Sequence, residues 1–143
     1  MDSSPQVKTI VQVYPHISNR IKAAFVDAIV IILLMLLFTD IFSKFESVPD
    51  YYKIVAFVFV FLAYEPIMVS VFGFSLGHFL NDLRVKRHSN PSKNLNIFLA
   101  IVRFITKSLL GWISLLTISG NPERRAIHDM LSDSVVIFFK KEV

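Results

Sequence analysis

Cysteine is missing from the 143 residues of this chain. Its absence excludes disulfide bonds, thiolate zinc sites and cysteine-ligated iron–sulfur clusters. Charged residues are also scarce, at 18% of the chain against about 25% in an average soluble domain. Because 54% of the residues are hydrophobic, the composition is not that of an ordinary soluble domain.

Motifs for catalysis are missing as well. No serine stands in a nucleophile-elbow motif, and Gly73 and Gly77 lack the Lys-Ser/Thr pair that completes a phosphate-binding loop. The histidines lack the spacing of metal ligands, and we expect them in solvated or interfacial positions: His16, His78, His88 and His128. We therefore predict no enzymatic activity, no cofactor and no metal site.

The apolar residues are concentrated in three blocks. Residues 21–39 and 52–72 each provide about the 20 residues that an α-helix needs to cross a bilayer, whereas block 95–119 is long enough but interrupted. No small-residue cleavage pattern follows the first block, so we interpret it as a retained helix rather than a signal peptide. The sequence predicts an all-α integral membrane protein with two full transmembrane helices and a third kinked or re-entrant segment.

We interpret residues 1–143 as a single membrane domain. Two short β-branched and aromatic runs outside the bilayer, "LRVKR" (83–87) and "DSVVIFF" (133–139), could pair as a small cytoplasmic sheet, joined by "VKTIVQV" (7–13). The expected order is a polar N-terminal segment, helix 1, helix 2, a basic connector, the third segment and a polar tail: 1–20, 21–39, 52–72, 73–94, 95–119 and 120–143.

Lysine and arginine set the expected orientation, because cytoplasmic loops carry an excess of them. If the third segment bends back around residues 108–111, eleven basic residues lie on the cytoplasmic side and two outside. Three straight spans, the alternative, leave seven against six, which is almost no bias. We therefore expect both termini in the cytoplasm. The basic residues flank membrane segments, so we expect membrane lipids and no nucleic acid as their partners.

Four ionisable residues fall at membrane depth: Asp27, Glu65, Arg103 and Lys107. Each costs roughly 2.5–3.5 kcal/mol near the bilayer centre unless it finds a partner or water. Arg20 lies two helical turns before Asp27, too far for a direct contact, so we expect Asp27 to meet a cation from another element.

One face of the third segment carries the natural partner. Small and polar residues recur there at spacings of three and four, with Arg103 opposite Asp27 or Glu65 in the expected bundle: Asn96, Ala100, Arg103, Lys107, Gly111 and Ser114. Glu65 precedes Pro66, which frees the carbonyl of Leu62. The Glu65 carboxylate and this freed carbonyl could together coordinate a cation. Alternatively, Pro66 could kink the helix near the membrane interface, with the Glu65 side chain reaching water.

Three readings of these charges stay open. They could form buried ion pairs that only fix helix packing, because such pairs can specify register without adding stability. They could line a path for an ion or a proton, since intramembrane carboxylates are frequent proton carriers. They could recognise a lipid headgroup or a partner helix.

Four stretches resemble the RDD family, which is named after one arginine and two aspartates. Arg20 and Asp27 in "RIKAAFVD" resemble its first Arg and Asp, and "GFSLGHFLNDLRV" (73–85) is similar to its G-x-[ST]-x-G-K stretch, with His78 where lysine is usual. Arg103 stands where the family commonly has arginine. "RRAIHDMLSDSVVI" (124–137) resembles its terminal signature, with Asp129 as the second aspartate and serine replacing threonine.

The resemblance implies a small bacterial membrane protein, with sodium–proton exchange attributed to some members. We therefore predict a cation or proton translocator of the bacterial inner membrane that acts as an oligomer, with Asp27, Glu65, Arg103 and Lys107 on the path. The alternatives are an accessory subunit or assembly factor bound to partner membrane subunits, and a protein that binds anionic lipids. For Asp129 we predict a structural role, as a cap or as the ion-pair partner of Arg84 or Arg20.

Overall fold

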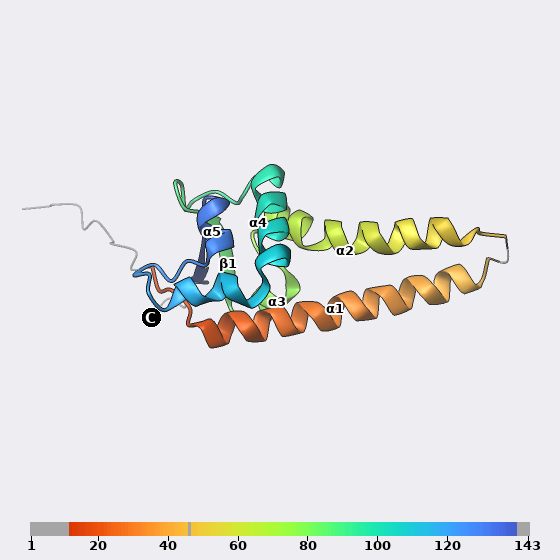
Figure 1. The fold of residues 1–143 in the computed structure, drawn as a ribbon, viewed down its shortest axis with the longest axis horizontal. Helices are drawn as coiled ribbons and strands as arrows, with labels where there is room; N and C mark the ends of the chain where they lie inside the picture. Colours follow the sequence, from red (N-terminus) through yellow and green to blue (C-terminus); the bar gives the residue numbers. More distant parts are fainter. Residues whose placement is uncertain (1–11, 46, 140–143) are drawn as a thin grey trace, which may run out of the picture.

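A long helical hairpin projects from a compact head, which is formed by residues 73–139 and the adjoining ends of the two hairpin helices (Figure 1). The computed structural model describes residues 12–45 and 47–139. Helix α1 (Ile17–Ser43) and helix α2 (Asp50–Phe72) form the hairpin, and each is longer at its loop end than the apolar block that predicts it. Both are long and apolar enough to cross a bilayer, so the chain is a multi-pass membrane protein.

The third apolar segment bends, as predicted. Helix α4 (Ile97–Leu110) ends at Gly111, and a 3-10 helix, η1 (Gly111–Ile118), follows in a different direction. Gly111 has a φ of +50°, a conformation that side chains rarely adopt, so the glycine makes the bend there. In Figure 1, α4 lies across the end of the hairpin and η1 runs back along the head. By length and composition alone, residues 97–118 would also suffice for a span.

The head also contains the small sheet that the sequence predicts. Strand β1 (Leu83–Arg87) pairs antiparallel with β2 (Ser134–Phe138), with Val85 opposite Val136. Two five-residue helices lead into these strands, α3 (Leu76–Leu80) before β1 and α5 (Ile127–Leu131) before β2. Most of the third expected strand, 7–13, lies outside the described residues, although the carbonyl of Val13 accepts a 3.0 Å hydrogen bond from the Phe138 amide.

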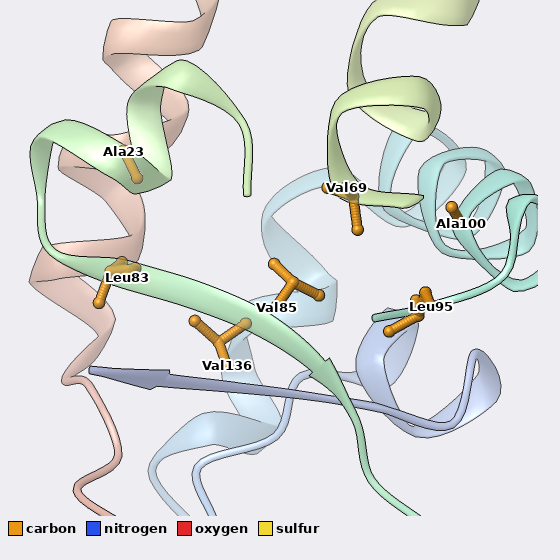
Figure 2. Close-up of a cluster of buried hydrophobic side chains, with 7 residues drawn as sticks. All are labelled: Ala23, Val69, Leu83, Val85, Leu95, Ala100 and Val136. Carbon is orange, nitrogen blue, oxygen red and sulfur yellow. The ribbon is translucent and has the colours of Figure 1, made fainter. Parts of the chain in front are cut away.

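The apolar core lies between this sheet and the helices. Figure 2 shows Leu83, Val85 and Val136 of the sheet gathered with Ala23, Val69, Leu95 and Ala100. Alternation along β1 puts Leu83 and Val85 on the buried face and leaves Arg84 on the other. The core therefore joins the first turns of α1 and the last turns of α2 to the sheet and to the start of the third apolar segment.

The loop-side halves of the hairpin differ sharply from the head. On α1 the buried residues are Arg20, Ala23 and Asp27, and on α2 they are Glu65, Pro66 and Val69. From residue 28 to residue 43, and from 50 to 64, the described side chains are all partly or fully exposed. Only hydrocarbon or other helices can cover such an apolar surface.

Candidate functional site

Two polar clusters lie where the hairpin enters the head. The first, which we call the Asp27 site, consists of Asp27, Tyr64, Ser75, Gly77 and His78. The second, the ion-pair network, consists of Arg20, Glu65, Arg103, Lys107 and Asp129. Three acids and three permanent cations are thus gathered in the two clusters, but they are not distributed evenly between them.

The Asp27 carboxylate is held by neutral donors. Its Oδ1 accepts hydrogen bonds from Tyr64 Oη at 3.0 Å and from the Gly77 amide at 2.8 Å, and its Oδ2 accepts one from Ser75 Oγ at 2.5 Å. Asp27 is only 5% exposed. Among the described residues, the one basic side chain within ion-pair distance is His78, whose Nδ1 lies 3.8 Å from Oδ2.

Gly77 makes this arrangement fit. A Cβ at position 77 would lie 2.0 Å from the Ala23 carbonyl oxygen and 2.7 Å from Asp27 Cγ. Because glycine has no Cβ, α3 can approach α1 closely enough for its backbone amide to reach the carboxylate. Ser75 starts α3 as its N-cap, accepting a 3.3 Å hydrogen bond from the His78 amide.

Ser75 links Asp27 to His78. Ser75 Oγ lies 2.5 Å from His78 Nδ1 and 2.5 Å from Asp27 Oδ2, so one hydroxyl bridges the two side chains. Burial, together with the nearby Arg103 and Lys107, holds the pKa of His78 well below its ordinary value of 6.5. His78 is therefore neutral at neutral pH. A lysine at this position would instead give Asp27 a permanent cation.

Glu65 forms the membrane side of the ion-pair network. Arg103 Nη1 donates to its Oε1 at 2.6 Å, and Lys107 Nζ donates to its Oε2 at 2.7 Å. Arg103 and Lys107 are one turn apart on α4, so both reach the same carboxylate on α2. The helix α2 continues through Pro66, and Glu65 is only 6% exposed. The interpretation of Glu65 as a side chain that reaches water is therefore wrong.

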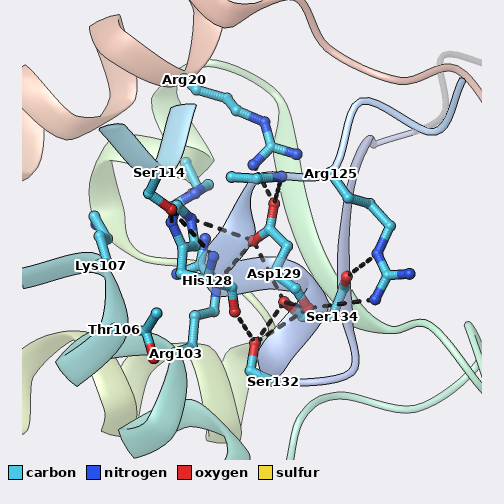
Figure 3. A network of polar contacts seen from close by, with 12 residues as sticks. Arg20, Arg103, Thr106, Lys107, Ser114, Arg125, His128, Asp129, Ser132 and Ser134 are labelled. Atoms are coloured by element: carbon cyan, nitrogen blue, oxygen red, sulfur yellow. Dashed lines mark hydrogen bonds and ion pairs between the residues drawn. The ribbon is translucent and has the colours of Figure 1, made fainter. Parts of the chain in front are cut away.

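Asp129 forms the centre of the network in the head. Figure 3 shows it between Arg20, which donates to Oδ2, and Arg103, whose Nε lies 3.3 Å from Oδ1. The Ala126 amide, at 3.1 Å, adds the predicted cap, and Ser134 Oγ adds a fourth donor. Burial alone would raise the pKa of Asp129, but the two guanidinium groups outweigh it and hold that pKa well below its ordinary value.

His128 closes the network toward η1. Its Nδ1 lies 2.6 Å from Ser114 Oγ, and its Nε2 lies 3.4 Å from Asp129 Oδ1. Burial, only partly opposed by Asp129, lowers the pKa of His128 to about 4. Ser114 is the last residue of the polar face predicted on the third segment, and it is fully buried.

Two of the contacts offered as alternatives by the sequence are absent. Of the two partners predicted for Arg103, the structure has Glu65, together with Asp129, and not Asp27, because α3 covers Asp27 first. Arg84 does not contact Asp129. It lies on the opposite face of β1 from the core, with its guanidinium 3.9 Å from the ring centroid of Phe74 and 4.4 Å from that of Phe139. The predicted contact between Arg20 and Asp129 is present.

Two of the four histidines also contradict the sequence prediction. His78 and His128 are buried, at 5% and 3% exposure, rather than solvated or interfacial. Tyr64 and Ser75, the side-chain partners of Asp27, are not predicted from the sequence. The sequence does contain a signal for the start of α3, because Ser75 is a typical helix N-cap residue.

Within the described ranges, no three histidine, aspartate or glutamate side chains converge as they would at a metal ion.

Comparison with known proteins gives one result. The model of the RDD family matches residues 14–133, a range that includes Arg20, Asp27 and Asp129. No curated protein matches the chain, and no solved structure does. The family match covers most of the chain, and it contains both polar clusters. The chain therefore belongs to the RDD family.

Proposed function

We propose that the protein exchanges protons with another cation across a bacterial cytoplasmic membrane, and that Asp27 is the group that takes up and releases the proton. One observation carries the proposal: Glu65 and Asp129 each contact two permanent cations, whereas Asp27 is held by neutral donors. A carboxylate without a fixed counter-ion can be neutralised by a proton or a small cation at much lower cost than a paired one.

Ser75 and His78 supply a route to Asp27. With Asp27 ionised, the Ser75 hydroxyl donates to Oδ2, so Ser75 Oγ must accept from the Nδ1–H of His78. When a proton arrives at His78 Nε2, the Nδ1 proton passes to Ser75 and the Ser75 proton passes to Asp27. His78 is neutral before and after this step, and it has changed tautomer. Since His78 lines a cavity in the head, Nε2 provides the outer end of the relay.

Glu65, Arg103 and Lys107 have a supporting role in this proposal. Their paired charges stay in place while Asp27 changes its own, and Arg103 and Lys107 keep His78 neutral between proton transfers. They are thus the fixed electrostatic surroundings of the path rather than its moving groups.

Asp27→Asn tests the proposal. The amide can keep the bonds from Gly77 and Tyr64 and can donate to Ser75, so the fold should tolerate it. We expect proton flux in proteoliposomes with an imposed pH gradient to fall to the level of empty liposomes, with thermal unfolding close to wild type. Asp50→Asn is the matched control and should transport normally, because Asp50 lies at the exposed loop end of α2, where it forms an ion pair with Lys53. Equal flux in Asp27→Asn and wild type would reject the proposal.

The bare loop-side halves of α1 and α2 support action as an oligomer. A single copy has no buried residue along the described parts of those halves, so it cannot enclose the rest of a path by itself. A second copy of the chain would supply the missing walls. Partner membrane subunits could cover the same surface, in which case the protein would be an accessory subunit or assembly factor. Native mass spectrometry of mildly solubilised protein distinguishes the two, since copies of one mass indicate the homo-oligomer.

We also propose that the head faces the cytoplasm. The bend at Gly111 returns Arg124 and Arg125 to the end of the molecule that holds Arg20, which supports the orientation with eleven basic residues inside and two outside. The cysteine-free chain allows a direct test. In intact cells, an impermeant thiol reagent should label Ser47→Cys in the hairpin loop and leave Ser92→Cys in the head unlabelled; the reverse pattern would contradict this orientation.

A further inference from the structure

A cavity of about 340 Å³ opens beside the ion-pair network. It lies between α1, α3, α5 and the bent third segment. One wall is basic and contains Arg20, Arg103 and Lys107 with the two buried histidines, whereas the other is apolar and includes Phe25 and Trp112. The volume is within the range of about 300–1,000 Å³ that is typical of small-ligand pockets.

The basic wall carries an excess of positive charge. No acidic residue lines the cavity within the described part of the chain. Among the described residues, Arg20, Arg103 and Lys107 form ion pairs with two carboxylates, those of Glu65 and Asp129. Lys107 is the most accessible of the three, with 27% of its side chain exposed, against 5% for Arg20 and 3% for Arg103. Its ammonium donates one hydrogen bond, to Glu65, and so has two N–H groups left for an anion.

The apolar wall leads to the lipid-facing surface. Phe25 is 68% exposed and Trp112 is 72% exposed, and both stand on segments long and apolar enough to cross a bilayer. A small water-soluble anion would fill only the basic end and would leave this wall uncovered. An amphiphile with one anionic group and a hydrocarbon chain matches both ends, because it places charge against charge and hydrocarbon against the aromatic rings.

We propose that this cavity binds one acidic membrane lipid, with the headgroup phosphate at Lys107 and an acyl chain between Phe25 and Trp112. The ligand is a phosphodiester of the bilayer, distinct from the proton that Asp27 is proposed to exchange, and it shares with that proton the cavity that His78 lines. The inference rests on the shape and charge of the cavity and does not depend on any transport activity.

The test measures lipid retention. The full-length protein is reconstituted in nanodiscs of equal parts phosphatidylglycerol and phosphatidylcholine, released into mild detergent and analysed by native mass spectrometry. We expect one phosphatidylglycerol per chain in wild type. Lys107→Gln should reduce retention by about tenfold, the factor for losing one charge-assisted hydrogen bond. Lys44→Gln removes the same charge from the exposed loop end of α1 and should retain lipid like wild type.

A second variant separates binding from folding. Ala24→Phe fills the cavity from α1 without changing any charge, and it should also reduce retention while thermal unfolding stays near wild type. Equal retention in wild type, Lys107→Gln and Ala24→Phe would overturn the proposal, as would equal retention of phosphatidylcholine. Inorganic phosphate added at millimolar concentration should not displace the lipid; displacement would show a site for free phosphate instead. The Asp27→Asn variant should keep its lipid even if its flux is lost, so the two proposals fail separately.

Discussion

Asp27 and Asp129 are both buried aspartates in the head, but their surroundings differ in kind. Asp129 contacts two guanidinium groups, from Arg20 and Arg103, and a backbone amide. Asp27 contacts two hydroxyls and a backbone amide, with a neutral histidine nearby. The same side chain is therefore fixed as an anion in one place and left without a permanent counter-ion in the other.

The two aspartates join the elements of the head in different ways. Arg20, on α1, and Arg103, on α4, meet at Asp129, which stands on α5, so one carboxylate holds three elements together. Asp27 joins α1 to α2 and α3 through Tyr64, Ser75 and Gly77, but those bonds remain satisfied when the carboxyl gains a proton. Paired charges thus join the elements around Asp129, whereas neutral donors join those around Asp27.

The largest change in stability is expected when the carboxylate of Asp129 is removed. Asp129→Asn leaves Arg20 and Arg103 buried opposite a neutral amide, and removing one partner of a buried ion pair costs about 3–5 kcal/mol. We expect the free energy of unfolding, measured by denaturant titration in detergent, to fall by about that amount. In contrast, Asp133→Asn removes a partly exposed acid that pairs with Arg87, and should cost at most about 1 kcal/mol. Similar losses in the two variants would contradict the central role of Asp129.

Acid should weaken the same network through His128. Its pKa is about 4 in the folded protein and 6.5 in its ordinary environment, so the unfolded chain binds the proton first. The contribution of His128 is therefore complete above about pH 6.5 and is lost as the pH falls toward 4, a loss of about 3 kcal/mol. His78, whose pKa is also lowered, acts in the same direction.

The measurement is thermal unfolding of wild type and His128→Asn between pH 7 and pH 4.5. Asparagine can keep the hydrogen bond to Ser114 but cannot become charged. We expect a smaller acid-induced fall in the unfolding temperature for the variant than for wild type. Parallel curves for the two proteins would show that His128 does not carry the acid sensitivity.

The sequence predicts the elements of this fold better than the contacts between them. Apolar blocks give the hairpin, the interruption near Gly111 gives the bend, and β-branched runs give the two strands, because each is a local pattern. For Asp129 the sequence leaves Arg84 and Arg20 as alternative partners, and the structure has Arg20.

The surroundings of Asp27 could not be predicted, because they depend on a tertiary fit. Helix α3 has five residues, too few to show a periodic pattern, and its position depends on Gly77 lying against the Ala23 carbonyl. The burial of His78 and His128 follows from the same packing. Spacing along a sequence does not report burial, so a buried histidine looks the same in the sequence as one at the surface.

A substitution in the Asp27 site is expected to have the smallest effect on stability. Its effect on proton flux should be specific. His78→Phe keeps a planar ring beside Asp27 but removes both nitrogens, so Ser75 can still donate to Asp27 while the route to the cavity is broken. We expect proton flux in proteoliposomes to fall by about tenfold or more, since positioned proton-transfer groups commonly contribute about 10²–10⁴. The unfolding free energy should change by less than about 1.5 kcal/mol.

His88→Phe is the matched control for this prediction. It makes the same substitution at a partly exposed histidine that pairs with Glu123, and it should leave flux unchanged. If His78→Phe transports as fast as His88→Phe, Asp27 receives its proton by another route, and the contrast with Asp129 would then concern packing alone. If flux falls only in His78→Phe, the proton reaches Asp27 through His78 in the Asp27 site.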